Sequence, residues 1–232
     1  MRLMSLSMSV IAFALAGCGS EAGDTLASDV EETASAAPED IAAEGEEVRI
    51  LAFGDSLFAG YNLAEHEGYP ERLERALRQA GVNARVIDAG VSGDTSAAGR
   101  QRLAFVLDQQ QVKPDLVMLE LGGNDMLRGL DPSDTRANFE AMLGELQGRE
   151  IPVLLMGMRA PPNYGPDYQR RFDALYGELA SEYGADLVPF WLESIYEKPA
   201  LFQDDRIHPT AEGIDEMVAF TLDDVKAALR EN

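Results

Sequence analysis

From residue 48 onward, short apolar runs alternate with longer segments whose apolar residues recur at helical spacing. The apolar runs predict strands at 48–53, 84–89, 115–121, 152–158 and 186–190. The helical spacing predicts helices at 70–80, 95–111, 132–148, 167–183 and 209–229. Strands that alternate with helices of this length are typical of a parallel sheet with helices on both faces. We therefore expect one α/β domain over 48–232 with a five-stranded parallel sheet, and take 2-1-3-4-5 as its strand order.

The N-terminal segment has a different pattern. Residues 1–17 combine Arg2 with an apolar stretch that ends in small residues, which predicts a secretory signal peptide. The stretch is too short to span a bilayer comfortably. Leu15–Cys18 resembles a bacterial lipobox, which implies cleavage before Cys18 and lipidation of its thiol. The expected location is that of an exported periplasmic or outer-membrane lipoprotein that meets the membrane through its lipid. The alternative is an ordinary signal peptide with an incidental cysteine.

Residues 18–47 are strongly acidic. Ten acidic residues and no Lys or Arg lie between Gly19 and Glu47 in a chain whose net charge is −22. This segment has few apolar residues to offset the cost of chain ordering, so we expect a disordered, self-repelling tether. A marginal exposed helix is the alternative. The overall charge argues against a nucleic-acid partner, which would need a basic surface. Cys18 is the single cysteine, so no intrachain disulfide can form.

Polar segments with reactive side chains follow the predicted strands, where sites of parallel sheets usually lie. Ser56 follows the first strand and is expected at a strand-to-helix junction, where helix-start N–H groups could face a developing oxyanion. A serine hydroxyl needs a base, and His208 is one of two histidines. Asp205 lies three residues before it, so a short loop could bring its carboxylate to the imidazole. Asp204 is the competing acid.

An acyl-transfer site also needs hydrogen-bond donors for the tetrahedral oxygen. Candidates are the backbone N–H groups of Ser56 and Gly93 and the side-chain amide of Asn124. Asn124 could instead hold a turn after two glycines. Asp55, Asp94 and Asp125 follow the same strands and are interpreted as structural.

Four motifs occur in order: FGDSL at 53–57, SGDT at 92–95, LGGND at 121–125 and DRIHP at 205–209. Together they resemble the conserved blocks of the SGNH (GDSL) hydrolase family. PPNYG at 161–165 and QDD at 203–205 resemble its bacterial acyl-CoA thioesterase I/lysophospholipase/arylesterase subfamily. The resemblance implies a three-layer, flavodoxin-like fold without metal or cofactor. It also implies Ser56 as nucleophile, Asp205 and His208 as its partners, and an oxyanion hole of Ser56, Gly93 and Asn124.

These features predict a serine esterase that hydrolyses small carboxylic esters or thioesters through an acyl-enzyme intermediate. The segment 158–165 is expected to border the acyl pocket. A second hypothesis is an O-deacetylase of envelope or extracellular polysaccharide, which would use the same site. A third is a non-catalytic, tethered binding lipoprotein that retains the fold.

Overall fold

The computed structural model describes residues 43–230. The predicted signal peptide (1–17), the lipidation site Cys18 and most of the tether (18–47) lie outside the described residues. Residues 43–47, the described end of the predicted tether, contain no helix or strand. None of the helices in 43–230 is both long and apolar enough to cross a membrane.

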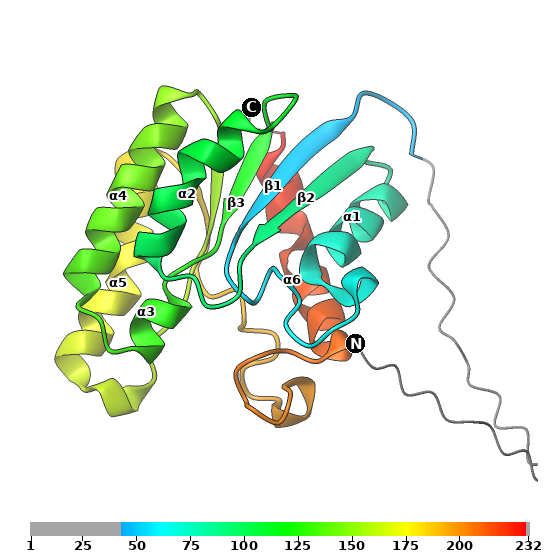
Figure 1. Ribbon diagram of the computed structural model, residues 1–232. Coiled ribbons are helices and arrows are strands. Elements are labelled where there is room, and N and C mark those ends of the chain that lie inside the picture. The colour runs from blue at the N-terminus through cyan, green and yellow to red at the C-terminus, as the bar shows by residue number, and fades with distance from the viewer. Residues whose placement is uncertain (1–42, 231–232) are drawn as a thin grey trace, which may run out of the picture. The chain divides into compact units, whose positions relative to one another are not determined.

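The centre of the domain is a parallel sheet of five strands (Figure 1). The strands are β1 (Val48–Gly54), β2 (Ala84–Gly90), β3 (Leu116–Leu119), β4 (Val153–Met156) and β5 (Asp186–Val188). Their order is β2-β1-β3-β4-β5. The predicted α/β class, the five parallel strands and the strand order are confirmed.

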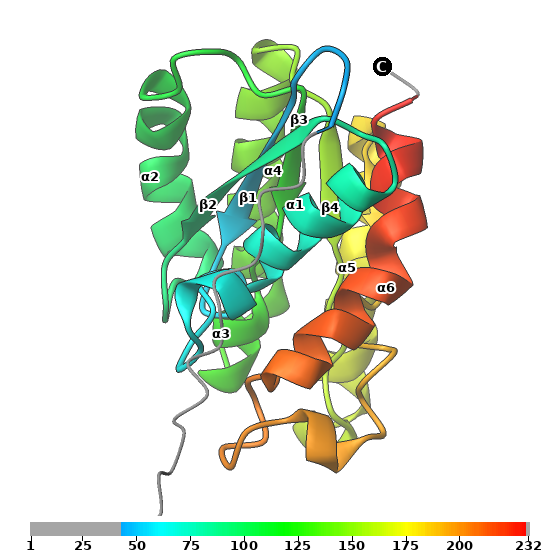
Figure 2. The same ribbon diagram turned by 90° about the vertical axis from the view of Figure 1, so that its right-hand side faces the viewer.

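Helices cover both faces of the sheet, and Figures 1 and 2 show α1 and α6 on one face and α2, α4 and α5 on the other. The helices are α1 (Tyr69–Gln79), α2 (Ser96–Asp108), α3 (Gly123–Leu127), α4 (Pro132–Gly148), α5 (Pro166–Tyr183) and α6 (Ala211–Ala228). Strand β3 and residues 50–54 of β1 are buried between the two layers, with Ile50, Phe53 and Leu119 all 0% exposed. A sheet covered on both faces requires such continuous apolar runs.

Local chemistry sets the ends of several elements. The side chains of Thr95, Asp131 and Thr210 accept backbone N–H groups in the first turns of α2, α4 and α6. Strand β5 ends at Val188, two residues earlier than predicted, because Pro189 has no N–H to donate. Helix α6 begins at Ala211 and not at 209, because Thr210 is its N-cap.

The prediction that Ser56 stands at the start of a helix is wrong. Turns follow β1, and the first α-helix begins only at Tyr69. The backbone of Asp55 and Ser56 accepts single i+4 and i+5 bonds from Ala59 and Tyr61, but no helix continues from them. Gly60 has φ of +62°, which ends a right-handed helical run at once.

Candidate active site

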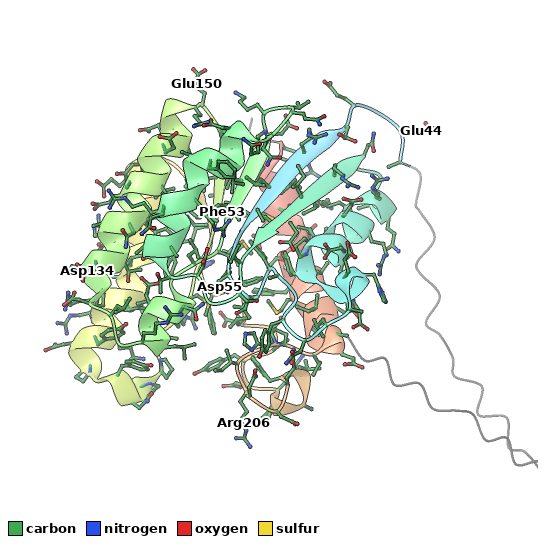
Figure 3. The ribbon with its side chains drawn as sticks, in the orientation of Figure 1. Glu44, Phe53, Asp55, Asp134, Glu150 and Arg206 are labelled. Atoms are coloured by element: carbon green, nitrogen blue, oxygen red, sulfur yellow. The ribbon has the colours of Figure 1, made fainter. Side chains whose placement is uncertain are left out.

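The polar segments after the strands meet at the carboxyl edge of the sheet. Ser56 follows β1, Gly93 follows β2 and Asn124 lies in α3, just after β3. The loop before α6 brings Asp205 and His208 to the same edge. Figure 3 shows Asp55 just beyond the end of β1, with Arg206 pointing outward from the α6 loop.

Ser56, His208 and Asp205 form one connected chain of hydrogen bonds. The Ser56 Oγ lies 2.8 Å from His208 Nε2, and His208 Nδ1 lies 2.7 Å from Asp205 Oδ2. A carboxylate can only accept, so Asp205 selects the tautomer with the proton on Nδ1. Nε2 is then the acceptor that faces the serine hydroxyl. This arrangement can move a proton from the hydroxyl to the imidazole.

The Asp205 turn holds its own carboxylate in place. Asp205 Oδ1 accepts the backbone N–H groups of Ile207 (2.9 Å) and His208 (3.0 Å). The intervening Arg206 adopts φ of +58°, which lets the chain turn back on the carboxylate. Partial burial of Asp205 would raise its pKa, but the N–H groups and imidazole of His208, with the Ile207 N–H, lower this pKa to about 2. Asp205 is therefore ionised wherever His208 can work as a base.

Two backbone N–H groups near the Ser56 hydroxyl could bind an anion. The N–H groups of Ser56 and Gly93 have no acceptor among residues 43–230. Gly93 has φ of +86°, a conformation that favours glycine, and its carbonyl accepts a bond from Arg128 (2.8 Å). Unused backbone N–H groups at a cavity wall are suited to bind a developing oxyanion.

The Asn124 amide lies next to these donors, but both of its hydrogens are in use. Nδ2 donates to Asp55 Oδ2 at 2.9 Å and to the Asp94 carbonyl at 3.0 Å. Asn124 lines the cavity, so its amide can donate to an oxyanion there only by giving up or sharing one of these bonds. The Asp94 side chain is held by Arg102, whose Nε lies 2.6 Å from Oδ2.

A cavity of about 670 Å³ opens over the serine. Apolar side chains make most of its wall, including those of Leu57, Leu127, Phe190, Leu192 and Ile207. The predicted bordering segment 158–165 contributes Met158, Arg159 and Pro161. A pocket that is mostly apolar with a few polar groups at one end suits an acyl chain whose carbonyl meets those polar groups. No cluster of three or more His, Cys, Asp or Glu side chains in the described part of the chain could hold a metal ion.

Comparison with known proteins assigns the family. The sequence model of the GDSL-like Lipase/Acylhydrolase family matches residues 52–215. The chain belongs to this family. Esterase TesA of Pseudomonas aeruginosa is 41% identical over 160 residues, which cover 69% of this chain and 79% of that protein. The arylesterase of Vibrio mimicus is 40% identical over 164 residues, which cover 71% and 81%.

Solved structures of GDSL-like relatives agree with this assignment. The SGNH-hydrolase family esterase AlinE4 is 59% identical, with a TM-score of 0.69 over 80% of this chain and 98% of that one. Two further AlinE4 structures replace a serine and an aspartate by alanine, at positions as far apart in that chain as Ser56 and Asp205 are here. The predicted SGNH-type fold and the class of ester or thioester hydrolase are confirmed.

Two further side chains contact the catalytic segments. The Tyr61 ring lies 4.3 Å from the His208 ring at an angle of 31°, so it covers one face of the imidazole. Glu120 is 0% exposed and contacts Asp55 directly behind Ser56. The sequence carried a signal for Glu120, because a charged residue inside the apolar run 115–121 is unusual for a buried strand. The contact of Tyr61 with His208 gave none, because it depends on how two loops meet.

Proposed function

We propose that this GDSL-like hydrolase cleaves carboxylic esters or thioesters of apolar acyl groups, with Ser56 as nucleophile. The observation that carries the proposal is the unbroken hydrogen-bond chain from Ser56 through His208 to Asp205 at the floor of an apolar cavity. The serine and aspartate replaced in the AlinE4 variants support the same pair of positions.

In the first half of the reaction, Ser56 Oγ attacks the acyl carbon while His208 Nε2 takes its proton. Asp205 keeps the proton of Nδ1 in place and stabilises the imidazolium that forms. His208 then protonates the alcohol or thiol leaving group, and the acyl group stays on Ser56. In the second half, His208 removes a proton from water, which attacks the acyl-enzyme and releases the acid.

The tetrahedral oxygen would be bound by the N–H groups of Ser56 and Gly93 and by Asn124. The first two donors are free for this role. Asn124 can take part when its hydrogen moves from the Asp94 carbonyl to the oxyanion, or when the two acceptors share it. Each such donor typically contributes about 3–4 kcal/mol to transition-state stabilisation.

The cavity favours an acyl substrate over the alternatives. Its wall is mostly apolar, which fits a fatty acyl or aryl group better than a polysaccharide chain. Relatives named esterase, arylesterase and "thioesterase 1/protease 1/lysophospholipase L1" support esters and thioesters as the substrate class. The connected site argues against a purely binding role.

We also propose that the enzyme works outside the cytoplasm on a lipid anchor. The support is the sequence of residues 1–18, with the lipobox-like Leu15–Cys18. The acidic segment up to residue 47 would hold the catalytic domain away from the membrane. Cells that express the chain with a labelled fatty acid should yield a labelled protein. Cys18→Ala should abolish the label, and a Cys18→Ala protein that keeps it would contradict the anchor.

The nucleophile is tested with Ser56→Ala. We expect this variant to melt like the wild type and to lose at least about 10⁴-fold in kcat with p-nitrophenyl butyrate. A fluorophosphonate probe should label the wild type and not the variant. Ser181→Ala, an exposed serine on α5, is the matched control and should keep both activity and labelling. Substantial turnover by Ser56→Ala would end the proposal.

A further inference from the structure

Two buried carboxyl groups lie side by side behind the nucleophile, and the proposed reaction does not use them. Asp55 follows β1 and Glu120 follows β3, two neighbouring strands in which Phe53 pairs with Leu119. The Asp55 N–H donates to Glu120 Oε2 at 3.1 Å. Gly54 makes room for this contact, because a Cβ at this position would lie 2.6 Å from the same oxygen.

The pair cannot carry two charges at low cost. Asp55 is 2% exposed and Glu120 is 0% exposed, and neither makes an ion pair in the described part of the chain. Burying an uncompensated charge costs several kcal/mol, so two adjacent carboxyl groups in such a place hold one proton between them. Their carboxyl groups lie within hydrogen-bonding reach of each other.

The surrounding donors decide which residue holds the proton. Asp55 accepts bonds from the Leu57 N–H (3.0 Å) and the Asn124 amide (2.9 Å). Glu120 accepts only the Asp55 N–H, and its Oε1 finds no donor among the described residues. Hydrogen bonds to the ionised form favour that form. Burial, followed by the charge of Asp55, also raises the pKa of Glu120 well above its usual range.

Burial also raises the pKa of Asp55 above its usual value, but by less than that of Glu120, because the donors from Leu57, Glu120 and Asn124 and the charge of His208 offset part of the effect. The charge therefore belongs on Asp55 and the proton on Glu120, which can donate to Asp55.

Other ionisable groups near the pair do not supply a counter-charge. Arg102 of α2 is bound to Asp94 and to the Gly54 carbonyl. Asp125 of α3 is held by Ser96 and Thr135. Tyr176 of α5 donates to the Leu121 carbonyl, and burial raises its pKa so that it stays neutral.

We propose that Glu120 holds the proton of this pair and that ionised Asp55 is a positioning residue for the oxyanion site. The Asp55 carboxylate turns the Asn124 amide so that its nitrogen, and not its oxygen, faces the candidate oxyanion. This inference rests on the proposed role of Asn124.

Protonation can be measured directly by carbon NMR of the full chain labelled at the glutamate carboxyl groups. We expect one glutamate signal to remain in its protonated position at about pH 8 and to vanish in Glu120→Gln. Glu71→Gln is the matched control and should leave that signal in place. If every glutamate is ionised at about pH 8, the proposal is overturned, whatever the variants do to activity.

Kinetics test the positioning role through two reciprocal variants. Asp55→Asn places an amide against Asn124 and removes the charge, so we expect kcat to fall by at least about 100-fold with little change in KM. Glu120→Gln keeps a neutral group that can accept and donate, so its loss in kcat should be less than about tenfold, also with little change in KM.

A larger loss in kcat for Glu120→Gln than for Asp55→Asn, or equally small losses for both, would overturn the inference. If Asp55→Asn fails to fold, the NMR titration and Glu120→Gln still decide. Failure of the proposed function gives a different result, because the wild type would then lack esterase activity or Ser56→Ala would retain it.

Discussion

Replacement of Asp205 by asparagine would separate its proposed catalytic role from its structural role. The Asn oxygen can still accept the N–H groups of Ile207 and His208, which lie 2.9 and 3.0 Å from Oδ1. The other side-chain atom changes from an acceptor to an NH₂ donor, 2.7 Å from His208 Nδ1. His208 must then accept at Nδ1 and carry its proton on Nε2, which faces Ser56.

The size of the effect follows from this change of tautomer. An Nε2–H cannot remove the proton of Ser56, which lies 2.8 Å away. Loss of the correct tautomer in a serine triad costs about 10⁴-fold in kcat, or about 5.4 kcal/mol at 1.36 kcal/mol per tenfold. Stability should change little in Asp205→Asn. Asp205→Ala also removes both turn bonds, and at about 0.5–1.5 kcal/mol each this variant should lose about 1–3 kcal/mol of stability.

The assay combines kcat and KM for p-nitrophenyl butyrate with a thermal melt of each variant. Asp204→Asn is the matched control, since this exposed neighbour makes none of the contacts of Asp205. We expect wild-type kcat and melting temperature from it. The reasoning is refuted if Asp205→Asn keeps kcat within about tenfold of wild type, or if Asp204→Asn causes the larger loss.

Two further predictions concern stability. Arg206→Gly should stabilise the fold by up to about 1 kcal/mol in thermal melts. The left-handed conformation at φ +58° costs a non-glycine residue about 1–2 kcal/mol, and glycine avoids this cost. The larger conformational entropy of glycine in the unfolded state offsets about 0.5–1 kcal/mol of the gain. Asn62→Gly, at φ +59°, should gain less, because asparagine tolerates this conformation; an equal or larger gain would contradict the argument. Glu71→Gln should raise the melting temperature at about pH 8 but not at about pH 4.5. Burial, with the charges of Asp88, Glu65 and Glu74, raises the pKa of Glu71 to about 7, so stability is lost as pH rises from its unfolded pKa of 4.5 to about 7. The side chain is partly exposed, so we expect about 1 kcal/mol and a shift of about 2–4 °C. Equal shifts in the melting temperature of Glu71→Gln at both pH values would refute this prediction.

The sequence predicted the parts of this structure that follow from pattern alone. Continuous apolar runs identify the strands of a doubly covered sheet, and parallel strands bring the segments at Ser56, Gly93 and Asn124 to one edge. Asp205 and His208 are three residues apart, so their pairing needs only one short turn. These relations are local, or they follow from the direction of the strands.

Other features depend on tertiary packing and could not be predicted in this way. Helix α3 has five residues, too few for an apolar period to show. The turn after Ser56 depends on backbone angles at Gly60 and Asn62, which no pattern of apolar residues encodes. The contact between Asp55 and Glu120 depends on the register of β1 and β3, which the strand order alone does not give.

The hydrogen bonds of Asn124 link the Asp55 carboxylate and the Asp94 carbonyl to a single step of the proposed reaction. One hydrogen is fixed on Asp55, so the amide cannot rotate its nitrogen away from the pocket while Asp55 is ionised. The other is bound to the Asp94 carbonyl, on the exposed loop that carries Gly93. In the proposed mechanism, an oxyanion that draws this second hydrogen away from Asp94 would change the contacts of the loop whose Gly93 N–H would also bind it. Donation by Asn124 and by Gly93 should therefore be coupled. Double-mutant cycles at Asn124 and Arg128, which holds the Gly93 carbonyl, should give non-additive losses in kcat, whereas additive losses would mean that the two donors act independently.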